Sequence, residues 1–575
     1  MDRRGRSFFR SGIARGIALA GIAGVAACNA LVGLDDLEHV LPDAPGGACS
    51  AAADCPAPGS ACKVAVCSEA GVCAVENVPV KTSCTEGGGA VCSAEGECVG
   101  CVDDADCNAP LVCGGAGVPG TCGCESPCLE WSKLLGGSNS TDNVFASMMS
   151  VHSDSSAFVT GWFDGSIEMG KGAQLVSAGG QDAFIAKIDP SGSVLWGRSV
   201  GDPDEQLGFG VGATGDGGVI WTGSFKGTVG FGSEGMTSWT SMGLRDAFVV
   251  KLNESGLLAW QNVSSYETAT IADQFGARVV LDAAGNSIVF GHFAGGLNFG
   301  TPINGADPMD MGAYDVFLVK FGPGGDHLWT KAFGDAKPQR GPGIALDAAG
   351  NIYLAGVLGG TLSLSPEPGK CDLTDISGAG EDIWVAKLDP AGNCIWAKNY
   401  GNADTQYVQT VDVDADGSVV VAGDLVGAVN FGNGAIASYG DRDAFVLKLD
   451  KDGKLAWIRR YGDPKTQGAV AAIFDGSGGV LVAGRFSGEV SFGVGDPLIS
   501  KSGLDSVFLL KLDSAGNSVW RRGFGETGAS ESRSVRLDPS GNIFLMGTTT
   551  GSIDFGGGLL VSSAAKSMFL VKFNP

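Results

Sequence analysis

The chain has 575 residues, including 94 glycines, and a formal net charge of −25. Frequent glycine with only 18% charged residues favours many short strands joined by tight turns, because glycine adopts the positive φ angles that hairpin turns need. The negative charge repels phosphate backbones, so we expect no nucleic-acid partner. With only four histidines and no recognisable catalytic constellation, we predict a monomer that is not an enzyme and has no cofactor.

Residues 1–27 predict a lipoprotein signal peptide. Five arginines precede an apolar stretch over 16–27, which is shorter than the roughly 20 residues that span a bilayer but fits a secretory signal. The sequence Val25-Ala26-Ala27-Cys28 resembles a bacterial lipobox. That resemblance implies cleavage before Cys28, lipid attachment to Cys28 and, with Asn29 following, an outer-membrane location at the cell surface or the periplasmic face. The alternative is an ordinary signal peptide with an incidental cysteine.

A proline- and glycine-containing tether is expected over 28–48, and a cysteine-rich disulfide module over 49–128. Fourteen of the 17 cysteines fall in this module, and an exported segment so short needs disulfides because it cannot bury a sufficient core. The phrase around Cys67 and Cys73 returns around Cys92 and Cys98. The module resembles cysteine-rich repeats of bacterial surface lipoproteins, as a rigid spacer or as a protein-binding module. Its cysteines, whose pairing the sequence leaves open, are Cys49, Cys55, Cys62, Cys67, Cys73, Cys84, Cys92, Cys98, Cys101, Cys107, Cys113, Cys122, Cys124 and Cys128. A zinc site at Cys98 and Cys101 is the rival interpretation.

Residues 129–575 contain seven degenerate copies of one repeat. A strand-like phrase with a D-x-x-G turn, such as DAFIAKIDPSGSVL, ends in a tryptophan, and successive tryptophans are 61–69 residues apart. The recurring tryptophans are Trp131, Trp196, Trp260, Trp329, Trp396, Trp457 and Trp520. A second phrase, such as VLDAAGNSIVFG, alternates with the first and is usually followed by Phe-Gly. Each repeat therefore predicts four antiparallel strands, A to D.

Two features of the repeats predict a closed ring. Strand A is rich in small residues, as at Gly208, Gly210 and Gly212, which suits crowding at a propeller axis. The chain enters with an unmatched strand D over 129–137 and leaves after an unmatched strand C over 567–573. Together these ends complete a seventh blade, with one strand from the N-terminus and three from the C-terminus, which removes exposed sheet edges.

The fold prediction is therefore an all-β, seven-bladed β-propeller preceded by a small disulfide-rich module. The repeats resemble SBBP-type bacterial propeller repeats, a resemblance that implies no particular activity. The phrase D-x-x-G-x-x-x-W is also similar to the tryptophan-docking motif of quinoprotein-like propellers. That resemblance implies that all seven tryptophans fasten neighbouring blades together.

The D–A and B–C connections share one face of the predicted ring, and their length makes this the expected binding face. Five glutamines lie on the D–A loops, where they would form a ring of amides suited to carbohydrate hydroxyls or make hydrogen bonds between blades. They are Gln206, Gln274, Gln339, Gln406 and Gln467. The residue after the strand-B glycine differs in every blade, so it specifies a ligand or is simply exposed to solvent. These residues are Trp162, Ser224, His292, Val357, Asp424, Arg485 and Thr548.

Two further groups carry weaker predictions. Asp412, Asp414 and Asp416 imitate the start of a calcium loop, but the twelfth position is Gly423 rather than the bidentate glutamate of an EF-hand. They are a weak calcium candidate beside the interpretation as a hairpin turn. Cys371 and Cys394, the only cysteines after Cys128, are a candidate disulfide in an oxidising compartment.

The leading functional hypothesis is a lipid-anchored surface module that displays a propeller to bind a glycan, matrix or another protein. The alternatives are a quinone-dependent enzyme or polysaccharide hydrolase or lyase on the propeller, and a scaffold in envelope assembly. The non-equivalent repeat positions of His152, His292 and His327 disfavour a shared catalytic site.

Overall fold

The computed structural model describes residues 127–575, apart from 171, 233–237, 265–272, 301 and 305–313, and only short strands before residue 127. The predicted signal peptide, Cys28 and the tether lie outside the described residues. The chain divides into two units, residues 1–102 and 103–575. Within the described residues there is no helix, and so none that is long and apolar enough to cross a membrane.

The described part of the cysteine-rich region consists of three short antiparallel hairpins. They are β1 (Lys63–Cys67) with β2 (Cys73–Asn77), β3 (Val91–Cys92) with β4 (Cys98–Val99), and β5 (Val112–Cys113) with β6 (Cys122–Gly123). In each hairpin two cysteines face each other across the strands: Cys67 with Cys73, Cys92 with Cys98, and Cys113 with Cys122. Each copy of the phrase duplicated in the sequence thus forms a hairpin, and β5 with β6 forms a third hairpin of the same kind. Cys67 and Cys128 each take part in a disulfide.

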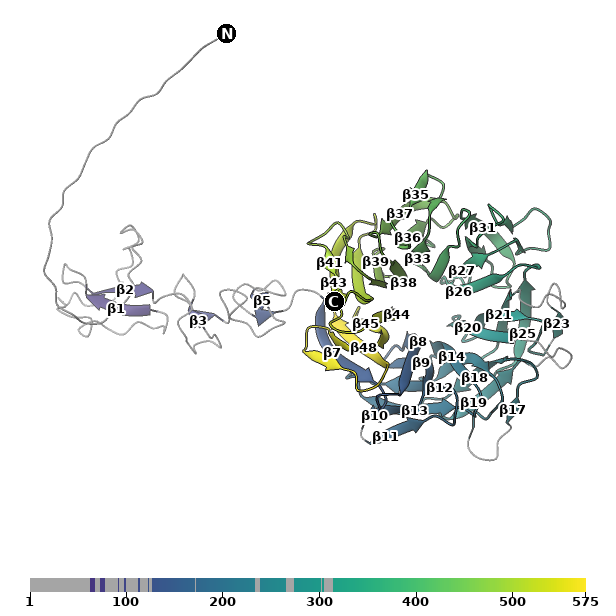
Figure 1. Cartoon of the computed structure of the whole chain (residues 1–575), viewed down its shortest axis with the longest axis horizontal. Coiled ribbons are helices and arrows are strands. Elements are labelled where there is room, and N and C mark those ends of the chain that lie inside the picture. The colour runs from purple at the N-terminus through teal and green to yellow at the C-terminus, as the bar shows by residue number, and fades with distance from the viewer. Residues whose placement is uncertain are drawn as a thin grey trace, which may run out of the picture. The chain divides into compact units, whose positions relative to one another are not determined.

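Seven four-stranded antiparallel sheets form a ring of blades around a common axis (Figure 1). Strand A of blades 1 to 7 is β8 (Asn143–Val151), β14 (Gln206–Ala213), β20 (Asp273–Leu281), β26 (Gln339–Leu346), β32 (Tyr407–Val413), β38 (Gln467–Phe474) and β44 (Ser530–Leu537). Strand B is β9 (Ala157–Asp164), β15 (Val219–Phe225), β21 (Ser287–Ala294), β27 (Ile352–Leu358), β33 (Val419–Leu425), β39 (Val480–Phe486) and β45 (Ile543–Thr549).

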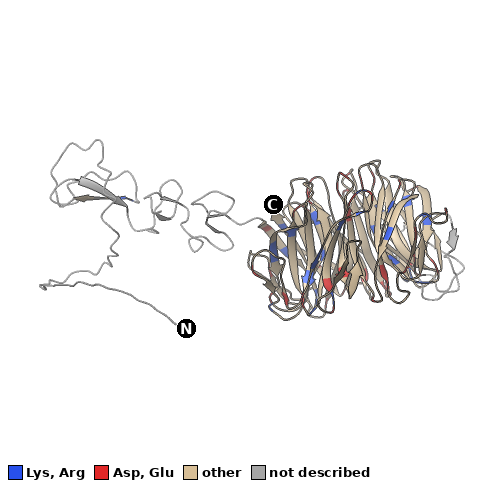
Figure 2. Cartoon of the chain, turned by 90° about the horizontal axis from the view of Figure 1, so that it is seen from above, with Lys and Arg blue, Asp and Glu red and all other residues tan. Residues whose placement is uncertain are grey.

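Strand C is β12 (Asp182–Ile188), β18 (Asp246–Leu252), β24 (Asp315–Phe321), β30 (Asp382–Leu388), β36 (Asp443–Leu449), β42 (Ser506–Leu512) and β48 (Ser567–Asn574). Strand D is β13 (Val194–Val200), β19 (Leu258–Val263), β25 (His327–Phe333), β31 (Cys394–Tyr400), β37 (Leu455–Tyr461), β43 (Ser518–Phe524) and, in blade 7, β7 (Cys128–Leu135). Seen edge-on, the blades stand side by side as a disc (Figure 2). The predicted fold and strand count are confirmed.

The two ends of the chain complete blade 7 as predicted. Its strand order is β44-β45-β48-β7, so one strand from before blade 1 pairs with the last strand of the chain. The register runs from Met568 opposite Leu135 to Asn574 opposite Cys128. Every blade therefore has its four strands, and the ring has no missing outer strand.

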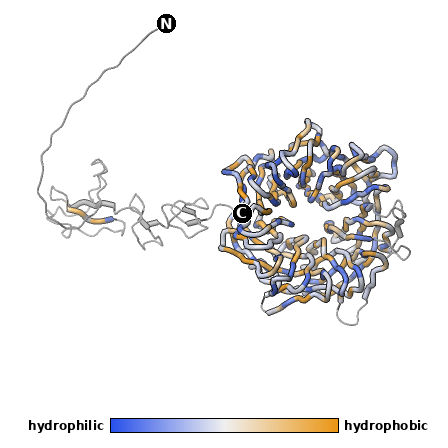
Figure 3. The backbone as a smooth tube through the Cα atoms, in the orientation of Figure 1, coloured by the Kyte–Doolittle hydropathy of each residue, from blue (hydrophilic) through white to orange (hydrophobic). Residues whose placement is uncertain are grey.

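The hydrophobic core is divided into seven layers, one between each pair of neighbouring blades. Apolar stretches run along the strands where blades face each other (Figure 3). Strands B and C are buried along nearly their whole length, because both faces of a blade are covered. The blades are held together by apolar packing, which contributes about 1.5–3 kcal/mol for each large side chain buried.

A small two-stranded hairpin in every B–C connection was not predicted. The pairs are β10 (Ser166–Gly170) with β11 (Ala173–Val176), β16 (Thr228–Val229) with β17 (Trp239–Thr240), β22 (Gly296–Asn298) with β23 (Pro302–Asn304), β28 (Thr361–Ser363) with β29 (Asp372–Thr374), β34 (Ala428–Asn430) with β35 (Ala435–Ala437), β40 (Glu489–Val490) with β41 (Leu498–Ile499), and β46 (Ser552–Asp554) with β47 (Leu559–Val561). The Phe of each Phe-Gly motif is buried just after the first hairpin strand; the Phe492 ring centroid, for example, lies 4.9 Å from that of Phe508 in strand C. The motif thus fastens the hairpin to its blade.

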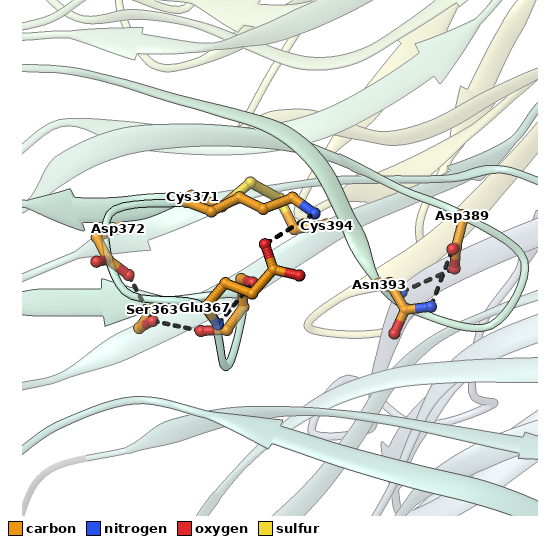
Figure 4. Close-up of a disulfide and its surroundings, with 9 residues drawn as sticks. Ser363, Glu367, Cys371, Asp372, Asp389, Asn393 and Cys394 are labelled. Carbon is orange, nitrogen blue, oxygen red and sulfur yellow. Dashed lines mark hydrogen bonds and ion pairs between the residues drawn. A yellow bond between two sulfur atoms is a disulfide. The ribbon is translucent and has the colours of Figure 1, made fainter.

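Blade 4 lacks the Phe-Gly motif and fastens its hairpin by other means. Leu362 and Leu364 are buried there. The predicted Cys371–Cys394 disulfide is formed, with the two Cα atoms 6.5 Å apart. It joins the β28–β29 hairpin to the start of β31, beside the Ser363–Asp372 hydrogen bond (Figure 4).

The tryptophans fasten each blade to the next, as the docking resemblance implies. The Trp196 indole N–H of blade 1 donates to the Glu254 carbonyl in the C–D turn of blade 2 at 2.9 Å. The turn glycine, Gly256, has a φ of 75°, and a Cβ atom on it would lie 2.8 Å from the indole. The same donation is made by Trp131, Trp260, Trp396 and Trp457. For Trp329 and Trp520 no indole hydrogen bond is present among the described residues.

This difference between the tryptophans gives a matched pair of substitutions. We expect Trp196→Phe to lower the free energy of unfolding by about 1 kcal/mol more than Trp329→Phe, since both lose ring area but only the first loses an indole hydrogen bond. Urea denaturation of the two variants measures the difference. Equal losses would contradict a role for the indole hydrogen bond.

Strand C begins with a buried aspartate in blades 1 to 5 and with serine in blades 6 and 7. Asp246 is typical: its Oδ2 accepts the Met242 backbone N–H at 3.1 Å, and its Oδ1 has no hydrogen-bond partner among the described residues. Burial raises the pKa of Asp246 to about 6. The carboxylate therefore orders the B–C connection but is buried without full compensation of its charge.

The raised pKa predicts a pH-dependent effect of Asp246→Asn. The folded protein holds the proton more tightly than the unfolded chain, so this group stabilises the fold below about pH 4, and that contribution is lost as the pH rises through about 6. Relative to the native chain, we expect Asp246→Asn to gain about 1 to 2 kcal/mol at pH 7 and little at pH 4. Urea denaturation at both pH values measures it, with exposed Asp452→Asn as control. A difference independent of pH would contradict the shift.

Candidate functional site at the channel mouth

The central channel is a cavity of about 670 Å³ lined by strand A of all seven blades. Strand A is therefore innermost, as predicted from its small residues. Each strand A carries an irregularity in its pairing with strand B, such as the break between Gly208 and Gly210. The residue at the break differs in every blade: Ser147, Phe209, Ala277, Pro342, Gln409, Val470 and Arg533. All of these except Ala277 line the channel.

The D–A and B–C connections lie on the same face of the ring, because the strands of each blade alternate in direction. We call the opening of the channel on this face the mouth. Half-buried aromatic side chains of blades 1 to 3 form one side of it, which we call the aromatic wall: Phe145, Trp162, Phe209 and Phe275. Phe145 stacks on Trp162 with ring centroids 5.5 Å apart, Trp162 meets Phe209 at 5.7 Å, and Phe209 meets Phe275 at 5.9 Å.

The aromatic wall is supported from behind. Phe275 stacks on His292 at 4.7 Å, and the Tyr314 ring meets His292 edge-on at 5.2 Å. Burial, and then the positive charge of Arg340, lowers the pKa of His292 to about 4. His292 is therefore neutral at physiological pH and acts as an aromatic platform.

Charged residues of blades 5 to 7 form the other side of the mouth, which we call the charged wall: Arg442, Asp424, Arg485, Asp505, Glu531 and Arg533. Arg485 lies among three carboxylates, 3.8 Å from Asp424, 3.7 Å from Asp505 and 3.6 Å from Glu531. Arg533 pairs with Glu531 at 2.8 Å. Burial raises the pKa of Asp424 to about 6 against the opposing effect of Arg485 and Arg442.

The glutamines predicted as a ligand face need correction. Gln206, Gln274, Gln339, Gln406 and Gln467 are all fully buried. In Gln339, for example, the amide N–H groups donate to Asp335 Oδ1 and to the Gly359 carbonyl, both at 2.8 Å, while its oxygen accepts the Asp335 N–H. The amides of Gln206, Gln339, Gln406 and Gln467 each join a D–A loop to the end of strand B or the start of the B–C connection. Gln274 donates to the Gly296 carbonyl in the B–C connection at 2.6 Å. All five amides therefore bond to the scaffold.

The variable position after the strand-B glycine is also not solvent-exposed. Ser224, Val357, Asp424 and Thr548 are buried, and Trp162, His292 and Arg485 are half-buried. Each pairs with a residue near the start of strand A, as Trp162 does with Phe145. The position therefore supplies both walls of the mouth. Its variability marks the position in the sequence, but its partners on strand A emerge only when the seven A strands are aligned.

The calcium candidate is not assembled. Asp412 lines the channel and accepts the Phe474 N–H at 2.8 Å, whereas Asp414 and Asp416 accept Ser418 N–H in the A–B turn. No group of three metal-ligating side chains occurs among the described residues. The hairpin interpretation is the one that these contacts support.

No family model matches the chain, so the resemblance to SBBP-type repeats stays a prediction. The chain is 26% identical over 204 residues to the regulatory protein FlaEY of Caulobacter vibrioides, covering 33% of this chain and 21% of that protein. It is 27% identical over 136 residues to the uncharacterized WD repeat-containing protein L264 of Acanthamoeba polyphaga mimivirus, covering 23% of this chain and 10% of that protein. The chain thus matches about a fifth or less of the length of these curated relatives.

Two solved propellers are similar in structure. The WD40 domain of Neurospora crassa Pan2 is 10% identical with a TM-score of 0.36, over 74% of this chain and 89% of that one. The β-propeller domain of the Trilobed protease from Pyrococcus furiosus is 9% identical with a TM-score of 0.34, over 75% and 93%. The strand pairing itself shows that the protein is a seven-bladed β-propeller.

Proposed function

We propose that this protein is a lipid-anchored, non-enzymatic surface protein that binds an extracellular glycan at the channel mouth. The observation that carries the proposal is the pairing of an aromatic wall with a charged wall across an opening that continues into a 670 Å³ cavity. A sugar ring has apolar C–H faces that pack on aromatic rings and hydroxyl groups that exchange hydrogen bonds with charged side chains. Cavities of a few hundred Å³ with a few convergent polar groups are typical of small-ligand sites.

The charged wall suits recognition rather than turnover. Its three arginines and three carboxylates are paired with one another, and Asp424 is buried. Such a network holds the guanidinium groups in fixed positions, as specific hydrogen bonding requires. Hydrolysis or cleavage of a polysaccharide panel by the purified chain, abolished by Glu531→Gln, would replace this proposal with an enzyme.

The test is binding of the full chain to a glycan array, followed by titration of the best ligand. We expect the double substitution Trp162→Ala and Phe209→Ala to weaken binding at least tenfold, because it removes two stacking faces of the aromatic wall. Leu257→Ala is the matched control, since Leu257 is exposed on the C–D turn of the opposite face. Unchanged affinity in the double variant, with its melting temperature showing it folded, would contradict binding at the mouth.

The lipid anchor is tested separately. We expect Cys28→Ser to move the protein from the membrane fraction to the soluble fraction, since Cys28 carries the lipid in this proposal. Mass spectrometry of the N-terminal peptide shows whether the lipid is present. A native chain without lipid would leave glycan binding intact but remove the surface anchor.

A further inference from the structure

Two arginines deep in the channel form no ion pair with a carboxylate of the described residues. Arg278 lies on β20 of blade 3 and Arg536 on β44 of blade 7, and both line the central cavity. Arg278 donates to the Ala277 carbonyl at 2.9 Å, and Arg536 donates to the Val535 carbonyl at 2.8 Å and to Met148 Sδ at 3.2 Å. Among the described residues, no carboxylate forms an ion pair with either guanidinium group.

The lining of the cavity is positive in a chain that is strongly acidic. Its charged residues are Arg278, Arg533, Arg536 and Asp412, whereas the whole chain carries −25. Arg533 is already paired with Glu531 at 2.8 Å. The negative charge of Asp412 raises the pKa of Arg536, but burial lowers that pKa by more. The two central guanidinium groups therefore remain under-compensated.

The arginines also repel each other. Burial, followed by the positive charges of Arg536 and Arg533, lowers the pKa of Arg278 to about 10. They project from blades on opposite sides of the ring into one cavity. Like charges brought together in a partly desolvated channel destabilise the fold unless an anion lies between them.

Guanidinium groups recognise oxyanions with particular geometry. Their planar N–H groups match the paired oxygens of a carboxylate or a sulfate, and charge-assisted hydrogen bonds of this kind are about twice as strong as neutral ones. The Gln409 amide and the Thr410 hydroxyl line the same cavity and offer further donors, whereas the Ser147 hydroxyl already donates to the Phe209 carbonyl at 2.9 Å.

We infer that the channel is an oxyanion site, in which Arg278 and Arg536 together bind the carboxylate or sulfate group of an acidic sugar. The inference rests on the proposed function, because the mouth holds the saccharide and the arginines select its charge. A free inorganic oxyanion shares this chemistry, so the test separates the two sources.

The experiment is isothermal titration of the full chain with sodium glucuronate, glucose and sodium sulfate at constant ionic strength set with chloride. We expect glucuronate to bind at least tenfold more tightly than glucose. The substitutions Arg278→Met and Arg536→Met, singly, should each reduce glucuronate affinity at least tenfold and leave glucose unchanged. Arg198→Met is the matched control, because Arg198 lies on the outer strand β13 and should bind glucuronate as the native chain does.

Folding of the variants is checked by their melting temperature in chloride. Because removal of one like charge relieves repulsion, Arg278→Met should melt no lower than Arg198→Met. If Arg278→Met melts at a lower temperature, the site is still supported when sulfate raises the melting temperature of the native chain but not that of the variant. Equal affinity of the native chain for glucuronate and glucose overturns the inference while leaving glycan binding at the mouth intact.

Other results of the titration would each overturn one part of the proposal. Sulfate binding with no preference for glucuronate over glucose would show an inorganic oxyanion site and overturn the acidic-sugar assignment. Glucuronate binding that survives both substitutions would overturn the role of the arginines. If no saccharide binds, but the native chain binds sulfate and Arg278→Met does not, the result would contradict the proposed function and retain the anion site.

Discussion

A chain that begins at Gly136, and so lacks β7, is expected to lose at least roughly 5 kcal/mol of unfolding free energy and to self-associate. Leu129 and Leu134 pack into the core layer between blades 6 and 7, while Trp131 and Leu135 pack into the layer between blades 7 and 1. Four large apolar side chains at about 1.5–3 kcal/mol each account for the loss. The outer edge of β48 would also be exposed, and unpaired edges recruit other strands.

The comparison is a chain that begins at Pro127 and carries Cys128→Ser, which retains β7 without a free thiol. Calorimetry measures the two melting temperatures, and light scattering measures association as a function of concentration. A synthetic peptide of residues 127–135 should restore the higher melting temperature of the chain that begins at Gly136. Equal melting temperatures of the two chains would contradict closure of the ring by β7.

The second large effect concerns the disulfide of blade 4. We expect the double substitution Cys371→Ser and Cys394→Ala to lower the unfolding free energy by about 3 kcal/mol, as loop-entropy arguments give for loops of this size. The bridged residues are 23 apart in sequence. Blade 4 has no Phe-Gly motif, so the disulfide adds a covalent link to the packing of Leu362 and Leu364 that holds its hairpin.

Substitution is preferable to reduction here, because a reductant also opens the disulfides of Cys67 and Cys128. Urea denaturation measures the loss, and hydrogen exchange should rise over residues 361–374 before it rises elsewhere in the propeller. The control is Ser363→Ala, which removes only the hydrogen bond to Asp372. Uniform exchange across all blades would contradict a local role.

The fold was predictable because the same pattern of strands and turns recurs in all seven repeats. Each D-x-x-G turn and each tryptophan fixed the position of strands C and D, and the unmatched ends specified closure. The B–C hairpins escaped prediction because their strands are only two to five residues long and are held by a pair of buried side chains such as Val490 and Phe492. The Phe-Gly motif marks these connections in five blades, but the rest of their sequence varies, so the strands themselves leave no repeated pattern.

The candidate site was only partly predictable. The position of Trp162 and Arg485 was identified from its variability, but the glutamines were assigned to the wrong role. A glutamine that recurs in five blades carries the same signal whether it binds a ligand or closes a loop, and only burial separates the two. Arg278 and Arg536 stand at different positions of strand A in different blades, so a repeat alignment does not bring them together.

The direction of β7 fixes the face of the propeller at which the chain enters. Strand D starts at the face of the C–D turns, so Cys128 lies there, opposite Asn574, while the mouth opens on the other face. Tension along the chain at Cys128 would therefore reach the ring on the face opposite the mouth. A ligand held at the mouth, as proposed, would load the ring across its thickness.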